Sequence, residues 1–562
     1  MEDQKQGFSH VEQLAHVDTS TEADVNIKKV DNLLIAHDHL FSEGRPKWEV
    51  LKENKKAMAV ILILLIGMIV GGTDGTVTNA LVGSQSFCKL MQGGYKDSSG
   101  KYAITAKTNT IWSAVNTPCQ VISVPLAGLV IDRIGRRFTM WIGLSILIVA
   151  GAVQLAAQSW RTFCIVKVLY GLAGGFTQVS SITFVSEIAP RELRGLLMAI
   201  VPLMTTTGIT LAAFITFYSN EKYPSPDDNL GYRIPEIVVL VLPVFIFILQ
   251  AFFLVETPYF LLLSGKSEQA EGNMRKLYPG RTDEQYAIQF AEYEYVLLKE
   301  SEKKELEAGS TFWDCLKGTD RRRTFCAMLP QMSQSFCGQS LISTQATYFF
   351  TLAGQTNSLR SSTISHCIGI IGYLVASGLL EVRSLGHFRM LVIGQFIMVT
   401  AMLILAVLTT KFATPYSLPV ADVILFCICF AVFGSAVGPG AAGWAYIGES
   451  SSARLRGKTS MWGVFGNTLI GASMSTAIPY MLVDSPTGLG VNGVGFFFFA
   501  FGVTMIIITV IWLPDYSGLS YAQIDELFLK RTPARRFRSS PTTGEYGWGI
   551  VVDDGGSKAV LH

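Results

Sequence analysis

The sequence is poor in charged residues and lacks the short motifs that mark enzymes. Only 16% of its 562 residues are Asp, Glu, Lys or Arg, whereas 49% are hydrophobic. Along the chain we find no paired carboxylates, nucleophile elbow, phosphate-binding glycine loop or cluster of metal ligands. We therefore expect a protein that is not an enzyme and that uses no cofactor and no metal.

Other absences bear on partners and compartment. The nine cysteines have no metal-ligand spacing, and most lie in or beside apolar runs, so we expect buried thiols. Because the net charge is only +2 and the basic residues are dispersed, nucleic acid is not an expected partner. The polar start of the chain has no apolar core of the signal-peptide type, so we expect no cleavable leader.

Long apolar stretches dominate the rest of the chain. About 20 apolar residues span a ~30 Å hydrocarbon core at ~1.5 Å per residue. Six such stretches precede a polar segment and six follow it, near 57–83, 109–131, 138–158, 162–187, 193–218, 235–256, 323–352, 362–382, 387–408, 420–447, 459–482 and 493–514. The expected fold is an all-α polytopic membrane protein with twelve transmembrane helices in two six-helix halves.

This pattern divides the chain into five predicted segments. They are an N-terminal tail over 1–56, a six-helix half over 57–256, a linker with surface helices over 257–322, a second half over 323–514 and a C-terminal tail over 515–562. Lys and Arg are more than twice as numerous in loops on the linker's side, which predicts that the linker and both tails are cytoplasmic.

The end of the stretch near 162–187 has a counterpart in the second half. The sequence ESSSARLRG from Glu449 repeats the spacing of EIAPRELRG from Glu187: a Glu, six residues, then Arg-Gly. The repeat favours two halves of similar plan related by an axis along the membrane normal. We expect a cytoplasmic charge network that holds the outward-facing state, built from Asp132, Arg133, Arg136, Arg137, Glu187, Arg194, Glu449 and Arg456.

Two charges occur inside the predicted spans. Asp74 stands between glycines in the stretch near 57–83, and Lys167 lies in an otherwise uncharged part of the stretch near 162–187. At the rise of an α-helix both fall in the outer third of the bilayer. One interpretation is a proton-coupling pair, since ionisable residues inside a membrane are usually functional. The alternative is that Asp74 caps a broken helix and Lys167 extends outward to water.

Small and polar side chains indicate where helices pack and where a ligand binds. Gly171 and Gly175 have the small-xxx-small spacing that lets another helix approach closely. Amides and hydroxyls are dense between 331 and 345, which suggests a wet cavity or, alternatively, polar contacts between helices. An aromatic face ringed by such groups suits a sugar. The candidate substrate-binding residues are Gln334, Gln339, Ser340, Trp444 and Asn467.

Several motifs carry a family resemblance. GLVIDRIGRR from Gly128, the two Glu/Arg-Gly repeats and VETPYFLL from Val255 resemble loop motifs of the major facilitator superfamily and its sugar porter family. The 334–341 pattern QSFCGQSL and the stretch IDELFLKRTPARRF from Ile524 are similar to fungal maltose and α-glucoside permeases. The resemblance runs from the first apolar stretch to Arg538.

The resemblance implies a proton-coupled sugar symporter that works by alternating access, with Asp74 matching the family's helix 1 carboxylate. Trp444 and Asn467 match the family's pattern. Other positions depart from it: Thr73, Lys167, Pro202, Ser335 and Ser340 stand where relatives often have Tyr, Arg, Gln, Gln and Asn. The expected partners are protons, a small polar cargo and the lipid bilayer of the cell membrane, and the expected state is a monomer.

Two other functions stay open. Loss of several hexose-binding amides is what a changed cargo would produce, so the protein is alternatively an exporter of a small sugar-derived metabolite. If Asp74 and Lys167 only fasten two helices, it is a proton-independent facilitator. A nutrient sensor on the same fold is disfavoured, because the tail after Pro514 has only 48 residues and no repeats.

Overall fold

The computed structural model describes residues 47–96, 100–189, 191–279, 286, 290, 315–353, 357–379, 385–412, 418–450, 456–482, 488–516 and 521–540. In these ranges the chain is helical, and its one β pairing is a single bridge between Lys96 and Tyr102. The all-α prediction is confirmed. The middle of the predicted linker, from 280 to 314, lies almost entirely outside the described residues.

The chain divides into two compact units, each taken by itself below. The smaller comprises residues 1–59, 190–193 and 256–309, and the larger comprises 60–189, 194–255 and 310–562. Within the smaller unit lie three short helices: α3 (Lys47–Glu53), α11 (Pro258–Leu263) and α12 (Ser267–Leu277). The Thr257 side chain caps α11 by accepting a hydrogen bond from the Phe260 amide, and α12 buries Ala270, Met274 and Leu277.

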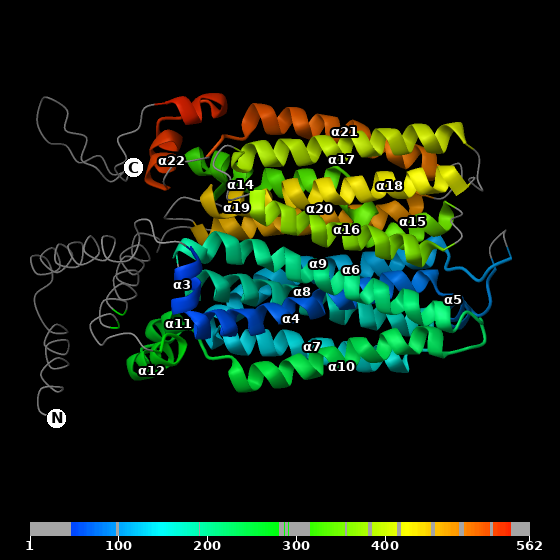
Figure 1. Ribbon diagram of the computed structural model, residues 1–562, viewed down its shortest axis with the longest axis horizontal. Helices are drawn as coiled ribbons and strands as arrows, with labels where there is room; N and C mark the ends of the chain where they lie inside the picture. Colours follow the sequence, from blue (N-terminus) through cyan, green and yellow to red (C-terminus); the bar gives the residue numbers. More distant parts are fainter. Residues whose placement is uncertain are drawn as a thin grey trace, which may run out of the picture. The chain divides into compact units, whose positions relative to one another are not determined.

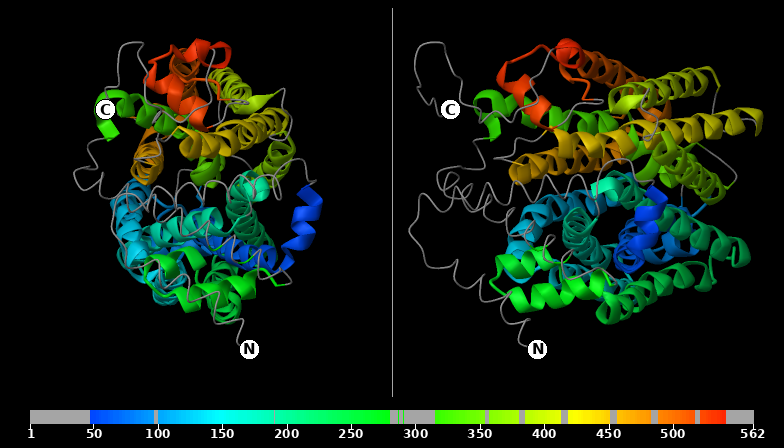
Figure 2. Two further views of the ribbon diagram at one scale, coloured as in Figure 1. Left: turned by 90° about the vertical axis from the view of Figure 1, so that its left-hand side faces the viewer. Right: turned by 60° about the vertical axis from the view of Figure 1, so that its left-hand side comes forward.

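The larger unit is a bundle of long helices (Figure 1). Its first half contains α4 (Lys55–Ala80), α6 (Ala106–Ile134), α7 (Arg136–Ala156), α8 (Trp160–Ile188), α9 (Arg191–Lys222) and α10 (Leu230–Phe253), and the first turns of α4 and α9 belong to the smaller unit. Its second half contains α14 (Gly318–Phe336), α15 (Ala346–Leu352), α16 (Ser358–Leu379), α17 (Gly386–Lys411), α18 (Leu418–Ser435), α19 (Ala441–Glu449), α20 (Arg456–Met481) and α21 (Gly490–Trp512). Figure 2 shows these halves as two groups of helices side by side.

Two π-helical turns interrupt the second half. The turn η4 (Ser340–Thr344) separates α14 from α15, and η5 (Ala436–Gly440) separates α18 from α19. In the described residues ten helical segments are long and apolar enough to cross a membrane. The segments α14–η4–α15 and α20, which complete the predicted twelve, are not among these ten because they are more polar. These two are the segments that carry most of the predicted substrate-binding residues.

The glycine pair on α8 packs against α6 as predicted. A Cβ at Gly171 would lie 2.7 Å from the Asn116 carbonyl oxygen, and one at Gly175 would lie 2.6 Å from the Ser123 carbonyl carbon. In addition, Ser123 Oγ donates a hydrogen bond to the Gly171 carbonyl at 3.1 Å. Gly72 of α4 and Gly208 of α9 form a similarly close crossing.

The two halves of the bundle meet along α6 with α20 and along α9 with α16. We call the end at which α4 and α14 begin the near end and the opposite end the far end. Toward the far end, Asn109 Nδ2 donates to Gln345 Oε1 at 3.3 Å, and the hydroxyls of Thr117 and Thr476 are 3.1 Å apart. Deeper in the bundle, Thr210 Oγ1 donates to the His366 carbonyl at 3.2 Å.

A short helix caps the first half at the far end. The helix α5 (Gln85–Gln92) follows the single turn η2 (Leu81–Gly83) and inserts Phe87 among Trp112, Phe163 and Tyr232. On its exposed side Lys89 pairs with Asp227, and their hydrogen bond raises the pKa of Lys89 and lowers that of Asp227. Because this pair is exposed, its contribution to stability is small.

The C-terminal segment packs against the near end of the second half. The helix α22 (Tyr521–Leu529) and the short helix η6 (Ala534–Ser539) bury Leu527, Phe528 and Phe537 in one apolar cluster with Tyr446 of α19 and Leu513. The Tyr446 hydroxyl donates to the Pro514 carbonyl at 3.1 Å. This packing fixes the segment to the ends of α14, α19 and α21.

Candidate functional site

The end of α14 and the residues that follow it meet α18 at a single serine, Ser435. Gln334 Nε2 donates a hydrogen bond to Ser435 Oγ at 3.0 Å, and Ser435 Oγ donates to Gln339 Oε1. Ser435 stands directly before the π-helical turn η5, and Gln339 directly before η4. Both turns leave the regular α-helical hydrogen-bond pattern, an arrangement that is frequent at functional sites. The structure therefore brings two predicted substrate-binding residues together through a residue that was not predicted.

The π-helical turn η4 is also tied to α20. Ser340 Oγ donates to the Gly471 carbonyl at 3.0 Å, and Gln345 Nε2 donates to the Ser475 carbonyl at 3.2 Å. Asn467 lies one turn of α20 before Gly471 and is partly exposed. Ser340 of η4 and Asn467 of α20 thus lie in the same region of the bundle.

Gln331, one turn before Gln334, is a buried amide without a partner. Its side chain is 1% exposed, and in the described part of the chain neither of its polar atoms makes a hydrogen bond. A Cβ at Gly443 of α19 would lie 3.0 Å from Gln331 Nε2, which places the amide against that glycine. The next residue, Trp444, is partly exposed. An unpaired buried amide costs free energy unless a ligand or water satisfies it.

Lys167 is held by α4. It is 7% exposed, and its Nζ donates to Thr78 Oγ1 at 2.7 Å and to Asn79 Oδ1 at 3.2 Å. Asp74 lies in α4 one turn before Thr78, so the two positions share a helix face. The Asp74 side chain lies outside the described residues, so the predicted pair with Lys167 stays a prediction.

A second buried carboxyl lies in the first half and was not predicted. Glu236 of α10 is 1% exposed, and among the described residues its nearest cation is Arg233, with Nη1 3.9 Å from Oε2. Gln154 of α7 faces this carboxyl and accepts a hydrogen bond from the Tyr170 hydroxyl at 2.6 Å. Tyr170 lies one turn after Lys167 on α8. The sequence signal was available, since Glu236 is an acidic residue in an otherwise apolar run.

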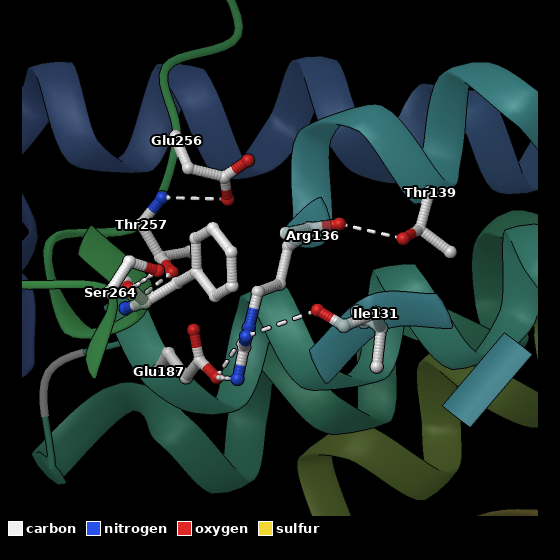
Figure 3. A network of polar contacts seen from close by, with 9 residues as sticks. Ile131, Arg136, Thr139, Glu187, Glu256, Thr257 and Ser264 are labelled. Atoms are coloured by element: carbon white, nitrogen blue, oxygen red, sulfur yellow. Dashed lines mark hydrogen bonds and ion pairs between the residues drawn. The ribbon is translucent and has the colours of Figure 1, made fainter. Parts of the chain in front are cut away.

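At the near end one predicted charge pair is formed. Arg136 makes two contacts with Glu187 Oε1, from Nε at 2.8 Å and from Nη2 at 2.6 Å, and both side chains are largely buried (Figure 3). Arg137 instead donates to the Ala251 carbonyl at 3.0 Å and stacks on Trp141. Figure 3 also draws the α11 cap, where Glu256 Oε1 accepts a hydrogen bond from the Thr257 amide at 3.1 Å.

Two further members of the predicted charge network have described side chains. Asp132 and Arg133 are exposed. The side chains of Arg194, Glu449 and Arg456 lie outside the described residues, so their role stays a prediction.

Comparison with known proteins decides the class. Residues 59–528 match the profile of a family described as sugar (and other) transporter. The chain belongs to this family. It is 26% identical over 500 residues to the maltose permease MAL61 of Saccharomyces cerevisiae, covering 88% of this chain and 80% of the permease. It is 25% identical over 501 residues to the general α-glucoside permease of the same yeast, covering 88% and 78%.

Solved structures agree on the fold of this transporter. The proton:xylose symporter XylE bound to 6-bromo-6-deoxy-D-glucose aligns with a TM-score of 0.66 and 19% identity, covering 85% of this chain and 100% of XylE. The inward-open XylE of E. coli aligns with a TM-score of 0.64 and 20% identity, covering 84% and 99%. The transporter therefore has the major facilitator fold. Its membership of the transporter family shows that it is a multi-pass membrane protein rather than an enzyme.

The polar groups at η4 and η5 of this transporter are hydrogen-bonding groups. In the described ranges no group of three or more His, Cys, Asp or Glu side chains could hold a metal ion. The groups gathered at η4 and η5 are amides, hydroxyls and carbonyls, which together donate and accept hydrogen bonds. Such groups can bind a neutral ligand with many hydroxyls.

Proposed function

We propose that this transporter carries a sugar, an α-glucoside such as maltose or a hexose, by alternating access of a central site to the two sides of the membrane. The observation that carries this proposal is the cluster Gln334, Ser435 and Gln339 at the two π-helical turns, with the unpartnered Gln331 beside it. A sugar hydroxyl can both donate to and accept from these amides.

The proposed binding residues are Gln334, Gln339, Ser340, Trp444 and Asn467. Gln339, Trp444 and Asn467 are partly exposed and so are available to a ligand, whereas Gln334 is buried and acts by orienting Ser435. The names of the yeast relatives, maltose permease and general α-glucoside permease, support a glucoside as the cargo class.

Proton symport is the proposed energy source. Lys167 presents a buried cation to the α4 face on which Asp74 lies, so a proton on Asp74 would remove its attraction to that cation. Glu236, buried on α10, is a second candidate carrier, because a buried carboxyl with one distant cation is costly to keep charged. XylE, a proton:xylose symporter with the same fold, supports this mode of transport.

Two alternatives differ from this proposal in what they predict. A facilitator would equilibrate the sugar without accumulating it. An exporter of a sugar-derived metabolite would bind the cargo with little or no uptake of maltose or glucose, and the departures at Pro202, Ser335 and Ser340 favour it.

We also propose the cell membrane as the location, with the near end and both termini in the cytoplasm. The charge bias of the loops supports this orientation. The near-end pair Arg136–Glu187 would then be one cytoplasmic part of the gate, and the far-end contacts Asn109–Gln345 and Thr117–Thr476 would close the outer side.

The proposal is tested by uptake of radiolabelled maltose, glucose and a few polyols into transport-null yeast at two pH values. We expect saturable uptake of at least one sugar, faster at the more acid pH. Uptake that does not depend on pH would favour a facilitator. Surface expression without uptake of any of these compounds would contradict sugar import and favour the exporter.

A further inference from the structure

The C-terminal segment presents basic side chains beside the near end of α14. Between Leu527 and Ser540 the sequence has several basic and no acidic residues. Arg322 of α14 donates from Nη1 to the Thr532 carbonyl at 2.7 Å and lies over the Phe528 and Phe537 rings. This contact joins two basic stretches that are far apart in the sequence. We call their exposed members the basic surface: Lys317, Arg321, Lys530, Arg531, Arg535, Arg536 and Arg538.

Exposed apolar side chains border this surface. Phe325 lies one turn after Arg321 on α14 and contacts Trp512, the last residue of α21, with ring centroids 5.9 Å apart. Both are exposed, Trp512 to 55%. Aromatic residues at the end of a membrane span favour the interface between hydrocarbon and headgroups, and basic residues just beyond it meet the headgroup phosphates.

Arg531 occupies a backbone position that ordinarily favours glycine. Its φ is 50°, and it is the one non-glycine residue with positive φ in the described chain. The Thr532 amide donates to the Leu527 carbonyl at 3.1 Å and the Arg531 amide to the Phe528 carbonyl at 3.0 Å, the two bonds that close a helix at a left-handed residue. An arginine there is strained relative to glycine, because its Cβ approaches the following carbonyl oxygen. A strained, exposed arginine is a reason to look for a function of its side chain.

We propose that the basic surface binds the headgroups of anionic phospholipids in the leaflet at the near end, and so anchors the second half of the bundle to that leaflet. Charge complementarity selects the ligand, since the surface is basic and the lipid phosphates and carboxylates are acidic. Some of the surface is already compensated, because Lys530 pairs with Glu526 at 2.6 Å and Arg538 with Asp515 at 3.7 Å. Arg321, Arg531 and Arg535 are therefore the residues on which lipid binding depends most.

The test measures lipid binding to the purified full-length protein in neutral detergent by native mass spectrometry, with phosphatidylserine and phosphatidylcholine as probes. One variant combines Arg321→Gln, Arg531→Gln and Arg535→Gln. The matched control combines Lys96→Gln, Lys101→Gln and Lys107→Gln, which removes three exposed positive charges at the far end. We expect the near-end variant to bind phosphatidylserine roughly tenfold more weakly or worse, with the control unchanged.

The single variant Arg531→Gly separates binding from folding. Glycine relieves the positive φ, so the melting temperature should hold or rise while phosphatidylserine binding falls. Equal loss of binding in the near-end and far-end triple variants would overturn the proposal, as would unchanged binding in the near-end variant. Inorganic triphosphate serves as the soluble probe: if the near-end variant loses triphosphate binding but keeps phosphatidylserine, the surface takes a soluble anion and the lipid proposal is wrong.

Discussion

At the scale of single residues, a buried ion pair distinguishes a residue that stabilises the fold from an exposed neighbour of the same type. Arg133 lies in the last turn of α6 and Arg136 begins α7 three residues later, yet Arg136 is 5% exposed and paired with Glu187, while Arg133 is exposed. A pair removed from water is costly to break, since the remaining charge keeps its burial but loses its partner.

Replacing Arg136 by alanine is therefore expected to lower stability strongly. The loss of the Glu187 partner should cost about 3 kcal/mol of folding free energy. The measurement is the melting temperature of the purified protein, compared with Arg133→Ala, which should change it little. Similar melting temperatures for the two variants would show that the Arg136–Glu187 pair contributes no stability.

The partly exposed Asn467 gives a residue-scale prediction about the cargo. Asn467→Ala should raise the apparent KM for the transported sugar roughly fivefold or more, because a lost hydrogen bond to a buried polar ligand costs about 1 to 3 kcal/mol. The matched control is Ser473→Ala on the exposed side of α20, where the hydroxyl donates to the Leu469 carbonyl at 2.7 Å. Unchanged KM in both variants, with normal abundance, would move the binding site away from Asn467.

At the scale of helices, close crossings depend on particular glycines. Gly174 and Gly175 are neighbours on α8, but a Cβ on Gly174 meets nothing within 4 Å, whereas one on Gly175 would lie 2.6 Å from the Ser123 backbone. Ser123 is part of α6, so the neighbouring backbone cannot move away without shifting a helix.

Gly175→Ala is expected to reduce the yield and melting temperature of the folded protein, because overpacking of a tight contact typically costs about 1 to 3 kcal/mol. Gly174→Ala should leave both unchanged or slightly improved, since alanine favours the helix over glycine. Thermal unfolding of the two purified variants makes the comparison. If Gly174→Ala proved the more damaging, the assignment of the α6–α8 crossing to Gly175 would be wrong.

Prediction from sequence succeeded where the signal is local. The spacing of Gly171 and Gly175 is read directly from one helix, and the long apolar stretches give the all-α membrane fold. The π-helical turns η4 and η5 were not predicted, because they depend on how α14 and α18 pack together rather than on either stretch alone. Ser435 was missed for the same reason: a lone serine in an apolar helix has no distinctive spacing, and its role appears only when Gln334 and Gln339 meet it.

Lys167 shows the limit of depth arguments. Helix rise predicts that Lys167 lies at a depth similar to that of Asp74 on α4. In the structure Lys167 does contact this part of α4, but its described partners are Thr78 and Asn79 rather than a carboxylate. Glu236 was missed although its charge was visible in the sequence, because its significance depends on Gln154 and Tyr170 from two other helices.

At the scale of the whole transporter, alternating access requires contacts between halves that form and break. The far-end contacts Asn109–Gln345 and Thr117–Thr476 join the two halves next to the predicted binding residues, since Gln345 directly follows η4. Cargo bound at η4 and η5 would therefore act on the same turn that holds the far end closed. The proposed coupling to protons would add a second input from the first half, through Asp74 and Lys167 on α4 and α8.

Proton-coupled sugar transport can be measured in proteoliposomes of the purified protein. With equal labelled maltose on both sides and an imposed inward proton gradient, the wild type should accumulate sugar, and a protonophore should abolish the accumulation. Asp74→Asn should lose this accumulation yet retain downhill exchange of maltose. Full gradient-driven accumulation by Asp74→Asn, still abolished by the protonophore, would exclude Asp74 as the coupling group, and absence of any maltose movement in the wild type would contradict maltose transport itself.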